Sequence, residues 1–183
     1  MASDFSIRHA AHIIRHGGII AYPTDTVYGL GCDPFNPIAV AQLNDIKQRK
    51  SDKQFILLAS DIEQIKPLVF ISEQQQNTIM QKDEPTSWIA KAKPSVPAWL
   101  CSDEHTLTFR ISKPSEAQRL CQTLGHAIIS TSANLPTKPP AKNALELHKY
   151  FHFSLDKILA NNKKLNAKPS KIIRLCDNRV IRQ

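Results

Sequence analysis

Apolar residues recur along this chain with two different spacings, and these spacings predict helices and strands in alternation. A helix is predicted over 4–16, because its apolar positions are three or four residues apart, and it ends at Gly17-Gly18. The positions that would form its buried face are Ile7, Ala10, Ala11 and Ile14. The apolar run over 19–22, closed by Pro23, predicts a short buried strand directly afterwards.

Further helices are expected where a capping residue precedes a periodic apolar run. One begins at Asn36-Pro37, and the capping boxes at 60–63 and 72–75 each begin another. Helices are also predicted over 114–124, where Gly125 ends the helix, and over 143–150. Strands are predicted over 55–59, 86–92, 106–111, 127–130, 157–159, 171–175 and 179–181.

This alternation predicts the α/β class, a sheet covered by helices, with some antiparallel pairing near the C-terminus. A length of 183 residues favours a single domain over 1–183. No apolar run is long enough to span a bilayer, and the N-terminus has no apolar core typical of a secretory signal. The four cysteines are scattered, which disfavours a zinc site or a disulfide framework and suits the cytoplasm.

The charge of the chain bears on its partners. Lys and Arg number 24 and Asp and Glu 16, so the formal net charge is +8, which favours phosphates, nucleic acid or anionic metabolites as ligands. Basic residues concentrate over 47–53 and over 161–183. A basic stretch is as often a solvated surface as a binding site, so the charge alone does not decide between the two.

The common catalytic signatures are missing. The sequence has no P-loop, no GxGxxG after a strand, no HExxH and no GxSxG. His9, His12 and His16 share one helical face, but no carboxylate or thiol completes a metal shell, so we interpret them as a solvated surface.

Three segments remain as candidates for binding chemistry. Residues 23–31 (PTDTVYGLG) follow a buried strand, where ligands bind in open α/β sheets, although these residue types also form ordinary turns. Residues 130–134 (STSAN) offer neutral donors to an anion or form a helix cap. Lys47 and Arg49 suit phosphate recognition, yet the dipole of the preceding helix also explains basic residues there.

Taken together, the order of these segments resembles the YrdC/TsaC family of threonylcarbamoyl-AMP synthases. The resemblance covers 17–182 and rests on GG-IIAYPTDTVYGLG, then KxR with a downstream Lys, then a TxxxR strand, STSAN, and PS followed by IR. It implies a twisted mixed sheet flanked by helices, with a basic concave face, in the short single-domain form.

The resemblance implies a nucleotidyltransferase that makes L-threonylcarbamoyladenylate and pyrophosphate from L-threonine, bicarbonate and ATP. The product would serve partner proteins that transfer the threonylcarbamoyl group to the adenosine beside the anticodon of certain tRNAs, so direct contact with tRNA is a further expectation. Mg²⁺ is expected to arrive with ATP and to bridge its phosphate oxygens.

The resemblance also carries roles onto particular positions. The expected catalytic set is Lys47, Arg49, Ser132 and Asn134. The expected ATP contacts are Lys47, Arg49, Lys53, Thr106, Ser132, Asn134 and Arg182. The expected L-threonine contacts are Thr26, Arg110, Ser130 and Ser170. Leu58 and Pro140 depart from the family pattern, since longer relatives have a threonine-contacting His and an ATP-contacting Ser there.

The residues suit the reaction, because an N-carboxylate formed from threonine and bicarbonate needs alignment and charge stabilisation rather than an acid–base pair. The alternative is a non-catalytic module that binds tRNA, rRNA or double-stranded RNA through the basic face. No KH or RNP pattern supports that alternative, and aromatic residues make up only 7% of the chain.

Overall fold

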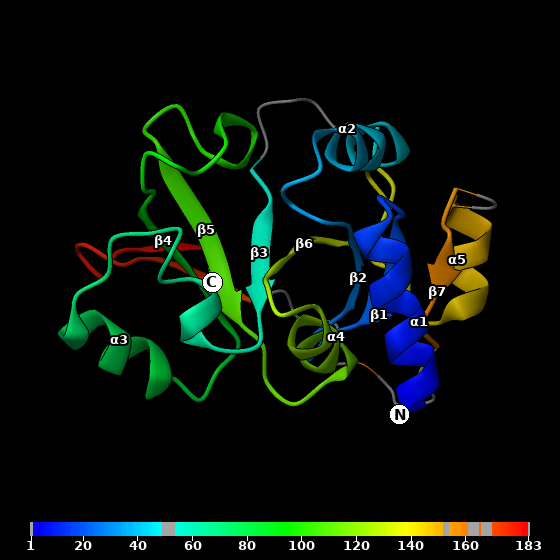
Figure 1. Cartoon of the computed structure of the whole chain (residues 1–183), viewed down its shortest axis with the longest axis horizontal. Helices are drawn as coiled ribbons and strands as arrows, with labels where there is room; N and C mark the ends of the chain where they lie inside the picture. Colours follow the sequence, from blue (N-terminus) through cyan, green and yellow to red (C-terminus); the bar gives the residue numbers. More distant parts are fainter. Residues whose placement is uncertain (1, 49–53, 152–153, 161–164, 166–169, 183) are drawn as a thin grey trace.

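The computed structural model describes residues 2–48, 54–151, 154–160, 165 and 170–182. In this part of the chain nine strands form one twisted sheet in the order β7-β1-β2-β6-β3-β5-β4-β8-β9 (Figure 1). Their bounds are β1 Ile20–Pro23, β2 Tyr28–Gly31, β3 Ile56–Ala59, β4 Thr86–Lys91, β5 Thr106–Ile111, β6 Ile128–Ser132, β7 Lys157–Ile158, β8 Lys171–Arg174 and β9 Val180–Arg182.

The helices begin and end close to the predicted positions. Their bounds are α1 Asp4–Arg15, α2 Pro37–Ile46, α3 Glu73–Met80, α4 Glu116–Leu124 and α5 Ala144–Phe151, with one-turn 3-10 helices at Ile62–Gln64 (η1) and Ala98–Leu100 (η2). Asn36 caps α2 as expected, and Gly125 ends α4 in a left-handed conformation with φ 82°. None of the helices in the described residues has both the length and the apolar character that a membrane crossing requires.

The α/β class is confirmed, but antiparallel pairing is far more widespread than expected. Only β7 with β1, β3 with β5 and β4 with β8 pair in parallel among the described strands. The other neighbours are antiparallel, including β1 with β2 and β6 with both β2 and β3. The sheet is therefore mixed throughout, and not only near the C-terminus.

The segment 23–31 forms a hairpin and not a long loop. Strand β2 was not predicted, because its glycines and the turn-forming residues before it conceal a strand of only four residues. Pro23 lies opposite Tyr28, so the turn between β1 and β2 consists of residues 24–27. This hairpin brings the polar TDT sequence to the end of a buried strand pair.

Two further details differ from the predictions. Asp61, and not Ser60, caps the helix that follows β3, and that helix is the single turn η1. Strand β6 continues to Ser132, two residues beyond its predicted end, because it pairs with β2 through Gly29 and Ser132. The capping box at Ser72 is confirmed.

Side chains alternate between the two faces of the sheet, and this alternation places the core and the open surface. On one face α1 and α4 pack together over Ile20, Tyr22, Leu58 and Ile128 (Figure 1). On the opposite face the larger apolar cluster includes residues of α2, α5 and the segment around η2. Positions two residues away from Leu58 and Ile128, on the same strands, share the first face without belonging to its apolar cluster.

Tyr22 fixes the hairpin to β6. Its ring is fully buried, and its hydroxyl donates to the Ile129 carbonyl at 3.1 Å. Burial raises the pKa of the Tyr22 phenol, which keeps the hydroxyl protonated as a donor. Gly31 leaves space for this ring, because a methyl group on Gly31 would lie 2.8 Å from the Tyr22 hydroxyl and would overlap the Ile129 carbonyl.

We therefore expect Gly31→Ala to destabilise the protein by about 3 kcal/mol, since backbone of β6 would have to move. The control is Gly125→Ala, where no atom lies within 4 Å of the added methyl group and only the positive φ costs energy, about 1 kcal/mol. Equilibrium unfolding in urea measures both variants. Equal losses, or a larger loss at Gly125, would contradict this account of the packing.

Candidate functional site

A cavity of about 350 Å³ opens on the face of the sheet that α1 and α4 only partly cover. Ile56 and Ser130 line it, and they lie two residues from Leu58 and Ile128 on β3 and β6. Its hydroxyl groups come from Thr24, Thr26, Thr108, Ser130, Thr131, Ser132 and Ser170. Its apolar surface comes from Val27, Ile56, Ile89, Ile172 and Ile181, and its charged groups are Arg110 and Arg182.

The turn between β1 and β2 is held by the hydroxyl of Thr24. This hydroxyl donates to the Val27 carbonyl at 2.7 Å and accepts from the amides of Thr26 and Val27. The Thr26 hydroxyl lies 3.0 Å from that of Thr24. The turn is thus rigid, and it fixes the Thr26 side chain at the cavity wall.

Arg110 enters the same wall from β5. Its Nη2 lies 3.0 Å from Asp25 Oδ1, and the two side chains are only 7% and 8% exposed. Its Nη1 lies 3.5 Å from the Thr26 hydroxyl. The hairpin turn and the guanidinium therefore form one polar cluster at this end of the cavity.

The end of β6 supplies a second cluster, built around Lys47 at the C-terminal end of α2. The Lys47 ammonium donates to the Ser132 carbonyl at 2.6 Å, to Asn134 Oδ1 at 3.0 Å and to the Asn134 carbonyl. The Asn134 amide in turn donates to the carbonyls of Leu135 and Lys138. Lys47 is buried, so these oxygens replace its hydration and tie residues 132–138 into one shape.

The third side of the cavity comes from the C-terminal strands. Arg182 donates from Nη2 at 2.8 Å and from Nε at 3.3 Å to the Ser170 carbonyl. The Ser170 hydroxyl lies 2.9 Å from the buried Ser87 hydroxyl. Partial burial, and secondarily the positive charge of Arg110, lowers the pKa of Arg182. The two guanidiniums therefore act on one space, where a bound anion would relieve their repulsion.

Gln54 and Thr108 complete the floor, and sequence reasoning missed both. The Thr108 hydroxyl donates to Gln54 Oε1 at 3.3 Å, and Gln54 Nε2 donates to the Thr106 carbonyl at 3.4 Å. Thr108 could have been found from the sequence, because it alternates with Thr106 and Arg110 along β5 and so shares their face.

The structure brings together some of the predicted site residues. Those that line the cavity are Thr26, Arg110, Ser130, Ser132, Ser170 and Arg182. Lys47 and Asn134 lie behind its rim, as described above, and not in its lining. Thr106 lines a neighbouring hollow of about 720 Å³, which shares Ile89 with the cavity. Arg49 and Lys53 lie outside the described residues.

The two departures from the family pattern have different settings. Pro140 lines the cavity, so it replaces a possible hydrogen-bonding group there with an apolar ring. Leu58 is fully buried beneath α4, where its carbonyl lies 3.1 Å from the Cys121 thiol, and it does not reach the cavity.

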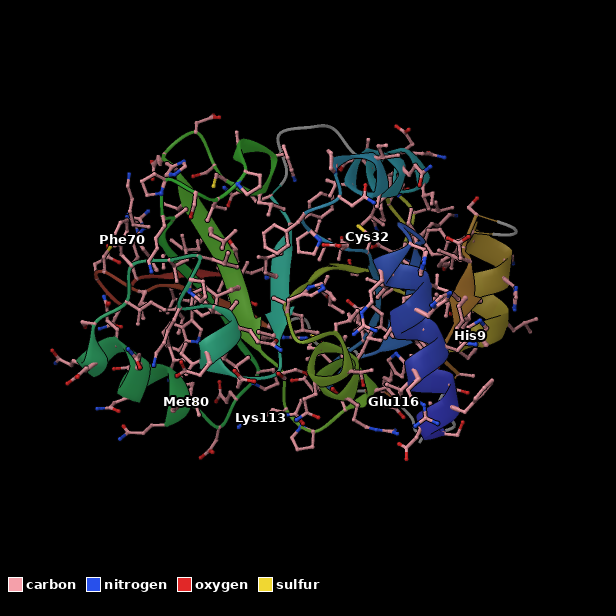
Figure 2. All side chains as sticks on the ribbon, viewed as in Figure 1. His9, Cys32, Phe70, Met80, Lys113 and Glu116 are labelled. Carbon is pink, nitrogen blue, oxygen red and sulfur yellow. The ribbon has the colours of Figure 1, made fainter. Side chains whose placement is uncertain are left out.

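The donor set around the cavity bears on whether the protein itself holds a metal. Among the described residues, no three or more His, Cys, Asp or Glu side chains gather closely enough to hold an ion. His9 lies exposed on α1, with Lys157 Nζ at 3.2 Å (Figure 2). Within the described chain the cavity lining offers hydroxyl oxygens and no carboxylate, so a Mg²⁺ ion there would take its charged oxygen ligands from phosphate groups.

Comparison with known proteins gives concordant results. The family model Sua5/YciO/YrdC, described as "Telomere recombination", matches residues 12–183. The chain is 40% identical over 171 residues to the threonylcarbamoyl-AMP synthase of Nitrosococcus oceani, and the match covers 92% of each chain.

Two solved structures share the fold. The structure of P. abyssi Sua5 complexed with L-threonine superposes with a TM-score of 0.88 at 26% identity, over 96% of this chain and 52% of that one. The chain thus spans about half of that longer protein. E. coli YciO superposes with a TM-score of 0.86 at 28% identity, over 97% of this chain and 88% of that one.

The role of Lys47 in shaping the loop leads to a prediction. Replacement by Met removes the ammonium from its loop oxygens while keeping much of the side-chain volume, so we expect a loss of about 2 kcal/mol in unfolding free energy. Hydrogen exchange at the backbone amides of residues 133–135, 137 and 138 should accelerate at the same time. The control is Lys91→Met, because Lys91 is exposed and donates to a backbone carbonyl on the surface, that of Glu104. Unchanged exchange in the Lys47 variant would contradict this role.

Proposed function

This chain belongs to the Sua5/YciO/YrdC family, and on that premise we propose that it is a threonylcarbamoyl-AMP synthase. It joins L-threonine, bicarbonate and ATP and releases L-threonylcarbamoyladenylate and pyrophosphate. The proposal rests on the near full-length relationship to a synthase and on the likeness to a structure that was determined with L-threonine.

The main structural support for this function is a single cavity that has one polar surface suited to an amino acid and another suited to phosphate groups. Thr26 and Arg110, which lie 3.5 Å apart, form an end of the cavity that suits a small amino acid with a carboxylate, and Ser130 lines the same cavity. Ser132 and Arg182 lie in the same cavity and suit phosphate oxygens. Its volume of about 350 Å³ lies within the range of small-molecule sites.

The chemistry needs no general base from the protein once the N-carboxylate exists. The threonine amine and bicarbonate give the N-carboxylate and water. An oxygen of this carbamate then attacks the α-phosphorus of ATP, and the bond to pyrophosphate breaks. Arg110 would hold the threonine carboxylate, and Arg182 would offset negative charge on the phosphates, so that the nucleophile and phosphorus stay aligned.

Magnesium enters this scheme as part of the substrate. Bound to the phosphate oxygens of ATP, it would withdraw charge from the α-phosphate and from the leaving pyrophosphate. The lining that the described residues form is rich in hydroxyls and has no carboxylate, which fits a metal that arrives with its own anionic ligands. Arg49 and Lys53 remain proposed ATP contacts.

Lys47 and Asn134 support the site indirectly in this proposal. Their hydrogen bonds fix the loop that carries Ser132, so they position a phosphate contact, and the Lys47 charge is already solvated by oxygens of that loop. Thr106 stays a proposed ATP contact, and it lies at the edge of the site because it lines the neighbouring hollow. Ser170 stays a proposed L-threonine contact in the same cavity, and its carbonyl accepts from Arg182.

The product is a mixed anhydride, so a group-transfer enzyme must consume it. We propose that threonylcarbamoyl-transferase proteins use it to modify the adenosine beside the anticodon of tRNA, and that contact of this chain with tRNA is secondary. The comparisons give no support to a purely RNA-binding module.

The function is tested by pyrophosphate release from purified protein. We expect release that depends on L-threonine, bicarbonate and Mg²⁺-ATP together, with serine and valine much less active. Release that does not respond to threonine would reject the assignment, and removal of bicarbonate by degassing should abolish turnover.

The role of Arg110 is tested by Arg110→Ala. We expect the KM for threonine to rise by about 100-fold, since a charged hydrogen-bonding group is lost, while the KM for ATP changes by less than about threefold. The control is Arg179→Ala, because Arg179 carries the same charge near β9 but does not line the cavity. An equal rise in both KM values would show that Arg110 is assigned to the wrong substrate.

A further inference from the structure

The Asp25–Arg110 ion pair is incompletely satisfied. Both groups are more than nine-tenths buried, and they approach to 3.0 Å. Within the described part of the chain, neither carboxylate oxygen of Asp25 has a hydrogen-bond partner, and neither has the Nε of Arg110. A buried carboxylate normally accepts several hydrogen bonds, so this arrangement is costly unless something else supplies them.

The position of the pair shows where such groups could come from. Arg110 lines the cavity, and so do Thr24 and Thr26, the residues on either side of Asp25. The turn that carries Asp25 is held in place by the Thr24 hydroxyl, so the carboxylate does not depend on Arg110 alone for its position. Arg110 thus belongs to the lining, and the unmet carboxylate of Asp25 lies directly behind this wall, 3.0 Å from the Arg110 guanidinium, where a small shift of the turn would bring it to a ligand.

The chemistry of these unmet groups defines a complementary ligand. It must donate hydrogen bonds to a carboxylate and accept them from a guanidinium within a very short span. An α-amino acid does both, because its ammonium and its carboxylate are attached to the same carbon. A simple carboxylic acid would satisfy Arg110 but would leave Asp25 without donors and add a second negative charge beside it.

We propose that Asp25 is a specificity-determining residue that recognises the α-amino group of the substrate while Arg110 holds its carboxylate. This inference rests on the proposed function, since it concerns the amino-acid end of the same cavity. Asp25 thereby restricts the site to amino acids and rejects hydroxy acids and other small anions that the two guanidiniums would otherwise attract. It also holds the nitrogen that becomes carboxylated at a fixed position relative to Arg110.

A purely positioning role for Asp25 makes a different prediction. If Asp25 only held Arg110 in place, its loss would weaken every ligand that uses Arg110 by the same factor. If Asp25 contacts the amino group, its loss weakens only ligands that carry that group. The two ligands that separate these roles are L-threonine and (R)-3-hydroxybutyrate, which is threonine without its amino group.

The experiment is a calorimetric titration of the full chain with each ligand, with and without Asp25→Asn. We expect the unmodified protein to bind L-threonine at least about tenfold more tightly than (R)-3-hydroxybutyrate, because hydrogen bonds to charged groups are among the stronger ones. In Asp25→Asn this ratio should fall to about two or less, through weaker binding of threonine. The matched control is Asp83→Asn, which removes the same charge from an exposed loop.

Each outcome decides the matter. The proposal is overturned if the unmodified protein binds L-threonine and (R)-3-hydroxybutyrate with about equal affinity, or if Asp25→Asn weakens the binding of both ligands by the same factor. The first of these results does not depend on a variant that folds. Asp25→Glu, which keeps the charge, should retain a ratio above that of Asp25→Asn. Pyrophosphate release by the unmodified protein is measured in parallel: threonine-dependent release together with an unchanged ratio rejects only the role of Asp25, whereas absence of threonine dependence rejects the proposed function.

Discussion

The alternation of side chains along β3, β5 and β6 governs both the stability of this protein and its site. Leu58 and Ile128 lie beneath α4, and Ile56 and Ser130, two residues away on the same strands, line the cavity. The helices on this face do not cover the whole sheet. Along β3 and β6 the same face therefore belongs to the apolar core at one position and to the binding site two residues away. A slip of one residue in strand register would exchange these surfaces, and the parallel and antiparallel pairings of β3 on its two sides resist such a slip.

Electrostatics then determine what the uncovered surface can bind. Two guanidiniums act on the cavity, while Asp25 is paired with one of them and Lys47 is solvated by the loop after β6. The cavity therefore keeps an excess of positive charge although its lining consists mostly of hydroxyl and apolar groups. Such a site favours a polyanion next to a small zwitterion, which is the pair of substrates that the proposed synthase must align.

The sequence was informative where a residue type and its strand period agree. The hydroxyls of Ser130 and Ser132 could be placed because they follow the apolar positions of a buried strand, whereas Arg110 was assigned through the family resemblance. The role of Lys47 could not, since a sequence gives a charge but not the oxygens that solvate it, and these come from a loop 85 or more residues away. Strand β2 was missed because glycine is chosen there for the space that Tyr22 needs, a tertiary requirement that mimics a turn signal.

The order in which the walls of the cavity occur along the chain has a consequence for biosynthesis. The hairpin turn comes first in the sequence, and the strands β3, β4, β5 and β6 follow. The wall that contains Ser170 and Arg182 comes last in the described sequence. A chain that ends after β6 has α1, α2 and α4, but it lacks Leu147 and Ile173 of the larger apolar cluster, Leu159 of the smaller one, and the Arg182 guanidinium of the site. The cavity is therefore complete only when the C-terminal strands β8 and β9 have joined the sheet.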